Sequence, residues 1–475
     1  MGVVKNYLYN LTYQIFILIV PLATIPYISR VLGPKYVGIN TLTYSVVQYF
    51  ALFAALGLAM YGQREIAYRR SDKEEMSRAF WEIELLSILT TAVTLVAYGI
   101  FLSFSKQYTM YYLCQSFFIL ACAADVSWFF IGLELFKITV LRNFVVKIAS
   151  IICIFTLVKN ESDLYIYILI VSLAQLIGNL SLWPYLTKYI QLVKIRDLHI
   201  FQHFSPTFAL FIPQVAINVY VYLNKIMLAK ISSVESAAFF DDSDKIVRIA
   251  LTVISALSTV MFPRIADAFS KGKYDEISSY VEKSFQISLA LAFPMMAGLI
   301  AIAPVFVPWF FGNEFLAVSP VMMVEAIAII PITCSQLMGM QYLVPTKLTK
   351  IYTKAIVIGA IINFVINIPL IFLWNAVGTA VATVFSEFFI AIFEFYYVFK
   401  KIKPSRAFEG ILKLIVASLI MFVIVKVLTM LLPTNIITTF MEVLIGMVCY
   451  IAMLYFFKFQ MLNSIVTSVV RKFRP

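Results

Sequence analysis

Charged side chains interrupt the apolar stretch from Ala124 to Ile148. They are Asp125, Glu134, Lys137, Arg142 and Lys147. An ionised group near the centre of a bilayer costs about 2.5–3.5 kcal/mol to insert, so such residues usually face a partner or a hydrated cavity. For Glu134 and Lys137, a position in a polar turn between two spans explains the charge as well as a functional role does. Asp125 and Lys147 lie inside the apolar runs, which favours a functional role for them.

Polar side chains recur at helical spacing in four other apolar segments. The sets are Asn10 and Gln14; Asn40, Tyr44 and Gln48; Gln214, Asn218 and Lys225; and Asp241, Lys245, Arg248, Thr252, Ser255 and Thr259. This spacing places each set on one face of its helix. The four faces together predict one central cavity that is polar and net cationic.

Two alternatives to this cavity remain open. Asn, Gln and Thr side chains also hold membrane helices together through hydrogen bonds between helices. The cations Lys225, Lys245 and Arg248 could instead pair with Asp241, Asp242 or Asp244, or lie at the end of a span near the headgroups.

A cationic cavity suits an anionic substrate, since ammonium and guanidinium groups bind phosphate through charge-assisted hydrogen bonds. The Asn, Gln and Tyr side chains suit hydroxyl groups, so the combination favours a sugar phosphate. Asp125 or Glu325 is a candidate for binding a coupling proton or cation. The chain has no GxxxxGK[ST] sequence for ATP, and we predict no cofactor.

The elements that must position these residues are membrane-spanning helices. Of 475 residues, 62% are hydrophobic and 13% charged, and the mean hydropathy is +0.92. Apolar runs of about 20 residues, enough to cross a bilayer as a helix, recur along the chain. We predict an all-α integral membrane protein with about fourteen spans. They begin near residues 7, 36, 79, 108, 138, 162, 206, 236, 278, 314, 350, 376, 408 and 436.

Basic residues sort to one side of this topology. Arg64, Arg69 and Arg70 follow the second span, and similar groups follow every later even-numbered span, whereas the opposite connections are short and carry few. Such asymmetry predicts that both termini are cytoplasmic in a multi-pass membrane protein. It also accounts for the formal net charge of +12 through anionic lipid headgroups, so no nucleic-acid partner is predicted.

A weak repeat at an offset of 200 residues divides the chain. Gln14 corresponds to Gln214, and Arg64 to Arg264. We predict a six-helix bundle at residues 1–187, a cytoplasmic amphipathic linker at 188–205 and a second six-helix bundle at 206–405. Two further helices follow at 406–460, and a basic cytoplasmic tail at 461–475. Parallel repeats of this kind place the transported species between the bundles.

The cysteines and histidines indicate no metal site. All five cysteines fall in apolar runs, where they are typical small core residues. His199 and His203 are one helical turn apart but lack a third ligand nearby, so we predict that they lie on an interfacial helix face.

Several motifs resemble those of one transporter family. The stretch around Asp125, Trp128, Gly132, Glu134, Phe136, Arg142, Asn143 and Lys147 is similar to a pattern of the Wzx-type polysaccharide or teichoic acid repeat-unit flippases, in the multidrug/oligosaccharidyl-lipid/polysaccharide exporter superfamily. Other stretches also resemble motifs of this family. They are YGQREIAYRR at 61–70, FFDDSDKIVRIAL at 239–251, Pro263-Arg264 and two motifs between Asn363 and Phe388. Residues 237–240 depart from its pattern, with Ala-Ala-Phe-Phe in place of Gly-Tyr-Tyr.

This resemblance implies a MATE-like fold of two six-helix bundles plus two C-terminal helices, working by alternating access in the bacterial cytoplasmic membrane. The implied substrate is an undecaprenyl-pyrophosphate-linked oligosaccharide, a precursor of capsule, O-antigen or teichoic acid, with capsule or teichoic acid favoured. Lys225, Lys245, Arg248, Arg142 and Lys147 would attract its pyrophosphate, and the polar stripes would hold the glycan. Membrane lipids, H⁺ or Na⁺, and a polysaccharide polymerase or ligase are the implied partners.

Two other functions compete with this one. A multidrug or organic-cation antiporter of the same fold would need an acidic cavity, whereas the stripes are net basic. A membrane polysaccharide polymerase would need catalytic groups outside the membrane. The short external connections and the two histidines of the chain argue against such an enzyme.

Overall fold

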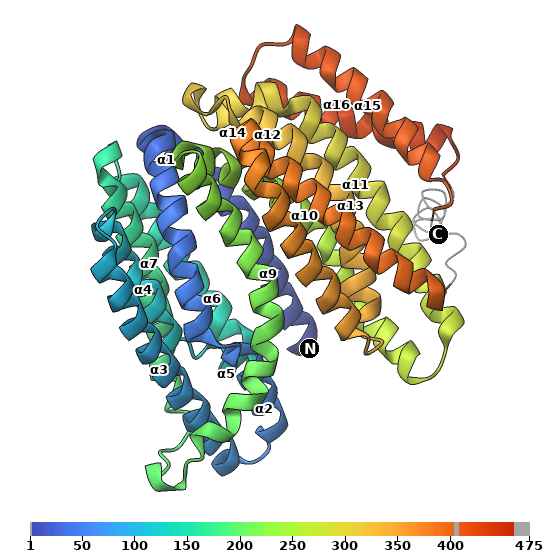
Figure 1. The fold of residues 1–475 in the computed structure, drawn as a ribbon. Coiled ribbons are helices and arrows are strands. Elements are labelled where there is room, and N and C mark those ends of the chain that lie inside the picture. The colour runs from blue at the N-terminus through green and yellow to red at the C-terminus, as the bar shows by residue number, and fades with distance from the viewer. Residues whose placement is uncertain (1, 403–407, 460–475) are drawn as a thin grey trace. The chain divides into compact units, whose positions relative to one another are not determined.

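The computed structural model describes residues 2–402 and 408–459. Within these ranges the regular structure is helical, with no strand (Figure 1). The chain divides into two compact units, Met1–Lys230 and Ile231–Pro475. The all-α fold predicted from the sequence is therefore confirmed, whereas the predicted bundle boundaries at 188–205 and 406 remain predictions.

The first unit is built from six long helices and several short ones. In chain order they are α1 (Gly2–Ala55), α2 (Leu58–Arg69), α3 (Lys73–Phe104), α4 (Thr109–Ala123), α5 (Ser127–Gly132), α6 (Phe136–Leu157), α7 (Leu164–Leu180), α8 (Trp183–Leu186) and α9 (Phe204–Ile231). Helix α4 packs against α1, α3 and α7, and α6 packs against α1 and α7. These helices run side by side in Figure 1, and α4 lies at the centre of their contacts.

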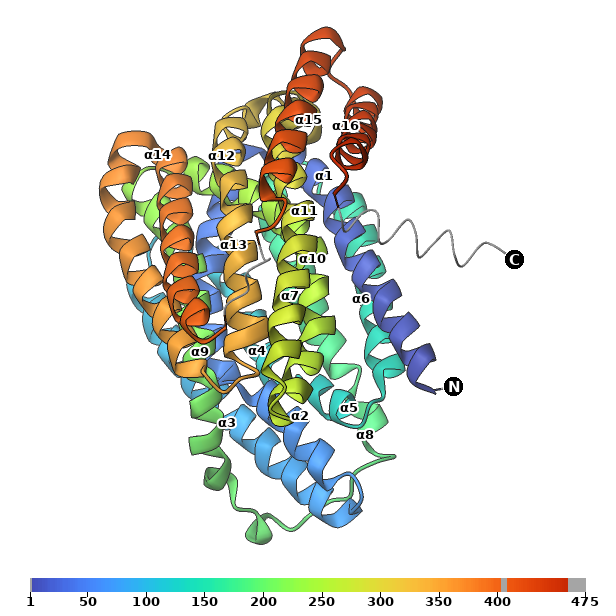
Figure 2. The same cartoon turned by 90° about the vertical axis from the view of Figure 1, so that its right-hand side faces the viewer.

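The second unit continues with α10 (Val234–Ser270) and α11 (Tyr274–Phe310). The remaining helices are α12 (Val318–Glu325), α13 (Ile329–Gln336), a π-helical turn (Leu337–Leu343), α14 (Thr349–Lys401), α15 (Ile411–Leu431) and α16 (Ile436–Phe456). Helix α11 packs against α10, α12 and the C-terminal pair α15 and α16 (Figure 2). The last two helices thus belong to the second unit by contact.

Two of the longest helices each hold two spans. Helix α1 breaks at Gly33, where φ is +68° and Pro34 follows, and α14 breaks at Asn375, where φ is +51°. Glycine adopts this left-handed region without a steric penalty, and Asn is among the residues that tolerate it. Ten described helices are long and apolar enough to cross a membrane. Counting α1 and α14 twice and adding α9 and α10 gives the fourteen spans predicted from the sequence.

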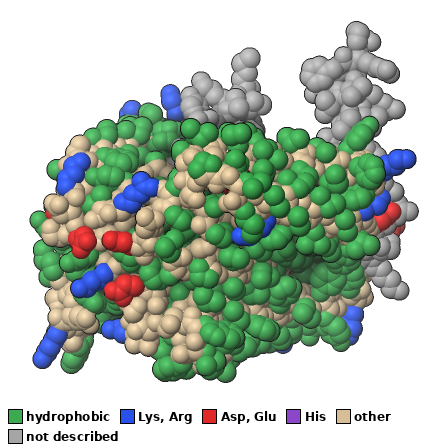
Figure 3. All heavy atoms as spheres, turned by 90° about the horizontal axis from the view of Figure 1, so that it is seen from above, with side chains coloured by type: hydrophobic (Ala, Val, Ile, Leu, Met, Phe, Trp, Pro, Cys, Tyr) green, Lys and Arg blue, Asp and Glu red, His purple; other side chains and the backbone are tan. Residues whose placement is uncertain are grey.

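The outer surfaces of these helices are apolar. Val93 and Val96 on α3, and Phe372 and Leu373 on α14, are among the many exposed large hydrophobic side chains. Hydrophobic side chains also cover much of the face seen in Figure 3, with few charged groups among them. In water such a surface would drive aggregation. It is suited to lipid, in agreement with a multi-pass membrane protein.

Two sequence motifs pack against each other at the end of the first unit. Helix α2, with the YGQREIAYRR sequence, lies against α5, with the WFFIG sequence. A Cβ atom on Gly62 would lie 2.5 Å from Cε3 of Trp128, and one on Gly132 would lie 2.8 Å from the carbonyl oxygen of Gln63. The two glycines therefore permit the close approach of these helices.

Replacing Gly62 by alanine is expected to destabilise the protein by about 1–3 kcal/mol, the usual cost of overpacking a filled core. Gly99 offers a matched control, since it also lies in a helix but a Cβ there would meet no atom within 4 Å. Thermal unfolding of purified Gly62→Ala and Gly99→Ala variants in detergent measures both effects. Equal melting temperatures would show that the Gly62–Trp128 contact is not close-packed.

Candidate functional site

The candidate site lies between two helix breaks of the first unit. Helix α4 ends at Ala123, and Ala124–Val126 are non-helical before α5 begins. Helix α1 ends at Ala55, and Leu56 and Gly57 follow with φ values of +42° and +73°. Non-helical backbone at membrane depth is tolerated where it is buried in protein or lines a hydrated cavity. Both breaks border the same pocket.

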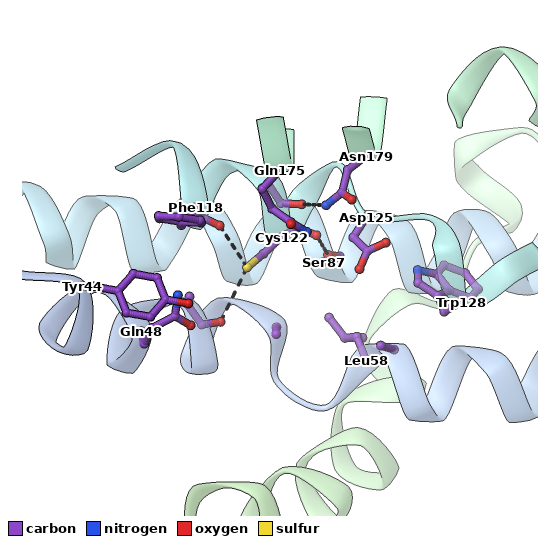
Figure 4. Close-up of a pocket in the computed structure, with 14 residues that line it drawn as sticks. Tyr44, Gln48, Leu58, Ser87, Phe118, Cys122, Asp125, Trp128, Gln175 and Asn179 are labelled. Atoms are coloured by element: carbon purple, nitrogen blue, oxygen red, sulfur yellow. Dashed lines mark hydrogen bonds between the residues drawn. The ribbon is translucent and has the colours of Figure 1, made fainter. Parts of the chain in front are cut away.

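This pocket has a volume of about 280 Å³. Its lining comes from α1, α2, α3, α4, α5, α7 and the α4–α5 break: Tyr44, Gln48, Ala51, Ala55, Leu58, Ala59, Ser87, Phe118, Ala121, Cys122, Asp125, Trp128, Gln175 and Asn179. Figure 4 shows Asp125 between Cys122 and Trp128, on the opposite side of the pocket from Leu58. Tyr44, Gln48 and Asp125, predicted separately from the sequence, thus share one pocket.

Asp125 carries the only formal charge among the described residues that line the pocket. Its Oδ1 atom accepts a hydrogen bond of 2.9 Å from the backbone N–H of Ser127, at the start of α5. Ser87 bonds the carbonyl oxygen of Cys122 at 3.3 Å, which ties α3 to the end of α4. The carboxylate is therefore held in position by the helix break itself.

Asn179 connects the pocket to Arg142. Its amide nitrogen donates to the carbonyl oxygen of Ala121 at 2.8 Å, and its Oδ1 accepts from Nη1 of Arg142 at 3.0 Å. Trp183 donates to the carbonyl oxygen of Ala124 at 3.0 Å, so it satisfies a second backbone group at the break. Arg142 therefore lies one side chain behind the pocket wall, and Asn179 sets its orientation.

A second carboxylate, Glu84, lies on the helix that contributes Ser87 to the pocket. Glu84 lies one helical turn before Ser87 on α3 and is completely buried. Neither of its carboxylate oxygens has a hydrogen-bond partner among the described residues. A buried carboxylate without a hydrogen-bond partner favours the uptake of a proton or a cation.

The other predicted residues of the first unit fall in several places. Asn40 accepts a hydrogen bond of 3.2 Å from Gln115, so it joins α1 to α4, as the helix-packing alternative describes. Asn218 donates to the carbonyl oxygen of Gln214 within α9. Lys147 is exposed on α6, whereas Lys225 is buried on α9. The side chains of Asn10 and Gln14 lie outside those that the structure describes.

The predicted residues of the second unit form a compact set of ion pairs on α10. Nζ of Lys245 lies 2.7 Å from Asp241 and 2.9 Å from Asp242, and Nε of Arg248 lies 2.7 Å from Asp244. The pairing alternative therefore describes both cations. On the adjacent α12, Glu325 is buried and accepts a hydrogen bond of 2.5 Å from Ser243.

Sequence reasoning missed three polar residues of the pocket lining, Ser87, Gln175 and Asn179, and the buried Glu84 on α3. Gln175 and Asn179 are four residues apart in an apolar span, which is the same signal that selected Tyr44 and Gln48. Glu84 lies three residues before Ser87 and therefore on the same helix face. A search for every polar pair at helical spacing would have found all four.

Comparisons with known proteins agree with this fold. A family model described as "Polysaccharide biosynthesis protein" matches residues 3–269. The chain is 24% identical to a Shigella dysenteriae protein named "Putative O-antigen transporter", over 78% of this chain and 94% of the relative.

Two solved structures share the fold. One is the lipid II flippase MurJ in an inward closed conformation, with a TM-score of 0.74, 16% identity and coverage of 96% of this chain and 99% of the other. The other is an inward-facing MATE family multidrug resistance transporter, with a TM-score of 0.67, 13% identity and coverage of 82% and 94%. The MATE-like fold that the motifs implied is thereby confirmed.

Proposed function

Because the chain belongs to the polysaccharide biosynthesis protein family, we propose that it is a flippase for undecaprenyl-pyrophosphate-linked oligosaccharides. It moves them by alternating access from the inner to the outer leaflet of a bacterial cytoplasmic membrane, with both termini cytoplasmic. The relatives that support this include a protein named as an O-antigen transporter and a lipid II flippase. Capsule and teichoic acid precursors remain the favoured substrates.

The observation that carries the proposal is the polar pocket between the two helix breaks. It places hydroxyl, amide and carboxylate groups inside an apolar bundle, where burying them has a free-energy cost that function must justify. Tyr44, Gln48 and Gln175 offer donors and acceptors for glycan hydroxyls. The pocket is smaller than an oligosaccharide, so it would receive one or two sugar units or the head of the substrate.

Arg142 is the cation that we assign to the pyrophosphate, because Asn179 of the pocket wall holds its side chain. Oδ1 of Asn179 accepts a hydrogen bond of 3.0 Å from Nη1 of Arg142 and so orients the guanidinium. Lys245 and Arg248 each have an aspartate at salt-bridge distance within α10. We therefore assign the α10 cations a structural role first, and Lys147 and Lys225 a role in attracting the anion.

Asp125 and Glu84 are the proposed site of the coupling ion. A proton or sodium ion bound between two carboxylates would offset their repulsion, and its release would change the charge beside the pocket. Glu325 is the corresponding candidate in the second unit, where Ser243 donates to it. Binding and release of the coupling ion would thus link the charge beside the pocket to the steps of the transport cycle.

A second function is favoured by one observation. The formal charge in the pocket lining is negative, which suits an organic cation, and the fold is shared with a multidrug resistance transporter. Protection of Cys122, a free thiol in the lining, separates the two candidates. Maleimide modification is measured by peptide mass spectrometry, with Cys153 on α6, outside the lining, as the internal control.

A lipid-linked oligosaccharide should slow modification of Cys122 and leave Cys153 unchanged. Protection by an organic cation, with no effect of the oligosaccharide, would show that the chain is an antiporter rather than a flippase. If neither compound slows the modification of Cys122, the pocket is not the substrate-binding site.

The ion pairs of α10 give a further prediction. Lys245→Ala should lower the melting temperature, because it removes a cation that pairs with the buried carboxylate of Asp242 at 2.9 Å. Adding Asp242→Asn should restore much of the stability. If transport recovers together with stability, Lys245 has only a structural role. If transport stays lost in the stable double variant, Lys245 contacts the substrate.

A further inference from the structure

Three buried side chains hold the segment at residues 188–204, which precedes α9, against the helices α2 and α3. The imidazole of His203 lies with Nδ1 2.7 Å from the hydroxyl of Tyr61 and Nε2 2.8 Å from Oε2 of Glu82. His203 and Glu82 are each 2% exposed and Tyr61 is 4% exposed. This position of His203 differs from the interfacial helix face predicted for both histidines.

The cluster of Tyr61, Glu82 and His203 keeps its hydrogen bonds in either protonation state of the imidazole. When His203 is neutral, Tyr61 can donate to Nδ1 while Nε2–H donates to Glu82. When it is protonated, Nδ1–H donates to the Tyr61 oxygen and the bond to Glu82 gains charge. The cluster therefore acts as a permanent attachment of the segment.

Further bonds attach the same segment to α3. The backbone N–H of His199 donates to Glu82 at 2.7 Å, and that of Gln191 donates to the hydroxyl of Ser77 at 3.0 Å. The indole N–H of Trp81 donates to the carbonyl oxygen of Gln191 at 3.0 Å. Polar backbone groups at both ends of the segment are thus directed toward α3.

The outward side chains of this segment combine apolar and basic groups. Leu192 is 90% exposed and Phe201 is 73% exposed, although neither lies in a candidate membrane span. Lys188, Lys194 and Arg196 are also exposed, against one exposed acid, Asp197. Large apolar side chains beside lysine and arginine are typical of segments that lie in the interfacial layer of an anionic membrane.

We propose that residues 188–204 form a binding surface for anionic phospholipid headgroups, held against α3 by the cluster of Tyr61, Glu82 and His203. Leu192 and Phe201 enter the headgroup layer, and the three bases contact lipid phosphates. The proposal requires only that the chain spans a membrane, so it stands independently of the transported substrate.

Hydrogen–deuterium exchange of the full-length protein in nanodiscs tests this surface. Peptides from 188–204 should exchange about thirtyfold more slowly in phosphatidylcholine with phosphatidylglycerol than in phosphatidylcholine alone, as expected for a net excess of two basic charges near an anionic surface. Replacing Lys188, Lys194 and Arg196 by glutamine should remove this difference. The same change at three other exposed lysines, Lys347 before α14 and Lys350 and Lys354 in its first turns, should leave it intact.

The attachment has its own test in the same experiment. Tyr61→Phe and His203→Ala should raise exchange at 199–203 in both lipids and reduce the effect of phosphatidylglycerol. Equal exchange of wild-type peptides in the two lipids would overturn the proposal. Protection by inorganic phosphate in zwitterionic nanodiscs would also overturn it, because the surface would then bind soluble phosphate.

Discussion

Replacing Asp125 by asparagine is expected to lower transport of the lipid-linked substrate roughly ten- to hundredfold, the range for losing one charge-assisted interaction. The substitution removes the formal charge from the pocket lining but preserves the shape of the side chain. The Asn carbonyl oxygen can still accept from Ser127 N–H, so the helix break and the fold should persist. Transport is measured in proteoliposomes after equal reconstitution.

Glu161→Gln is the matched control, since Glu161 is an exposed acid of the same unit outside the pocket. The double variant Asp125→Asn with Glu84→Gln should be no worse than Asp125→Asn alone, because both carboxylates serve one coupling ion. Additive losses would instead indicate two independent sites. Wild-type transport by Asp125→Asn would remove this residue from the mechanism.

Replacing Arg142 by alanine is expected to reduce transport by about a hundredfold, since it removes the cation assigned to the pyrophosphate. Arg142→Lys should recover only part of the activity, because lysine keeps the charge but lacks the planar donor pair that matches a phosphate. The transport assay is the same, with the melting temperature as a check on folding.

Lys137→Ala provides the control for Arg142, because Lys137 is an exposed base on the same helix. It should transport at close to the wild-type rate. If Arg142→Lys is fully active, a positive charge is sufficient and bidentate recognition is excluded. If Arg142→Ala is fully active, the pyrophosphate is bound elsewhere.

The sequence predicted the helices well because the length of an apolar run is set by the thickness of the bilayer. The predicted spans begin near 108, 350 and 436, within a few residues of the starts of α4, α14 and α16. Even the breaks inside α1 and α14 were anticipated, since the predicted second and twelfth spans begin near 36 and 376. Gly33-Pro34 and Asn375 supply the local chemistry of those breaks.

The partners of the polar residues were harder to predict. Helical spacing shows that Tyr44 and Gln48 share a face, but it does not show which helix the face meets. The contact of Asn179 with both Ala121 and Arg142 depends on how α7 packs on α4 and α6, which no local pattern encodes. For the α10 cations the sequence left two alternatives open, substrate binding or pairing with the aspartates one helical turn away, and only the structure shows the ion pairs of Lys245 and Arg248.

The contacts of the motif residues were equally hard to predict from the sequence. The YGQREIAYRR sequence was selected as a family motif, and the structure explains Gly62 by its contact with Trp128 and Tyr61 by its bond to His203. Both are packing roles rather than substrate contacts. A motif can therefore identify a family correctly while its residues serve the scaffold.

The most direct test of the central proposal is flipping by the purified protein in liposomes. Undecaprenyl-pyrophosphate-linked oligosaccharide is supplied on one leaflet, and its appearance on the other is followed with and without an imposed proton or sodium gradient. A flippase predicts movement that depends on the protein and responds to one of these gradients. No movement of any lipid-linked glycan, together with uptake of an organic cation, would contradict the proposal.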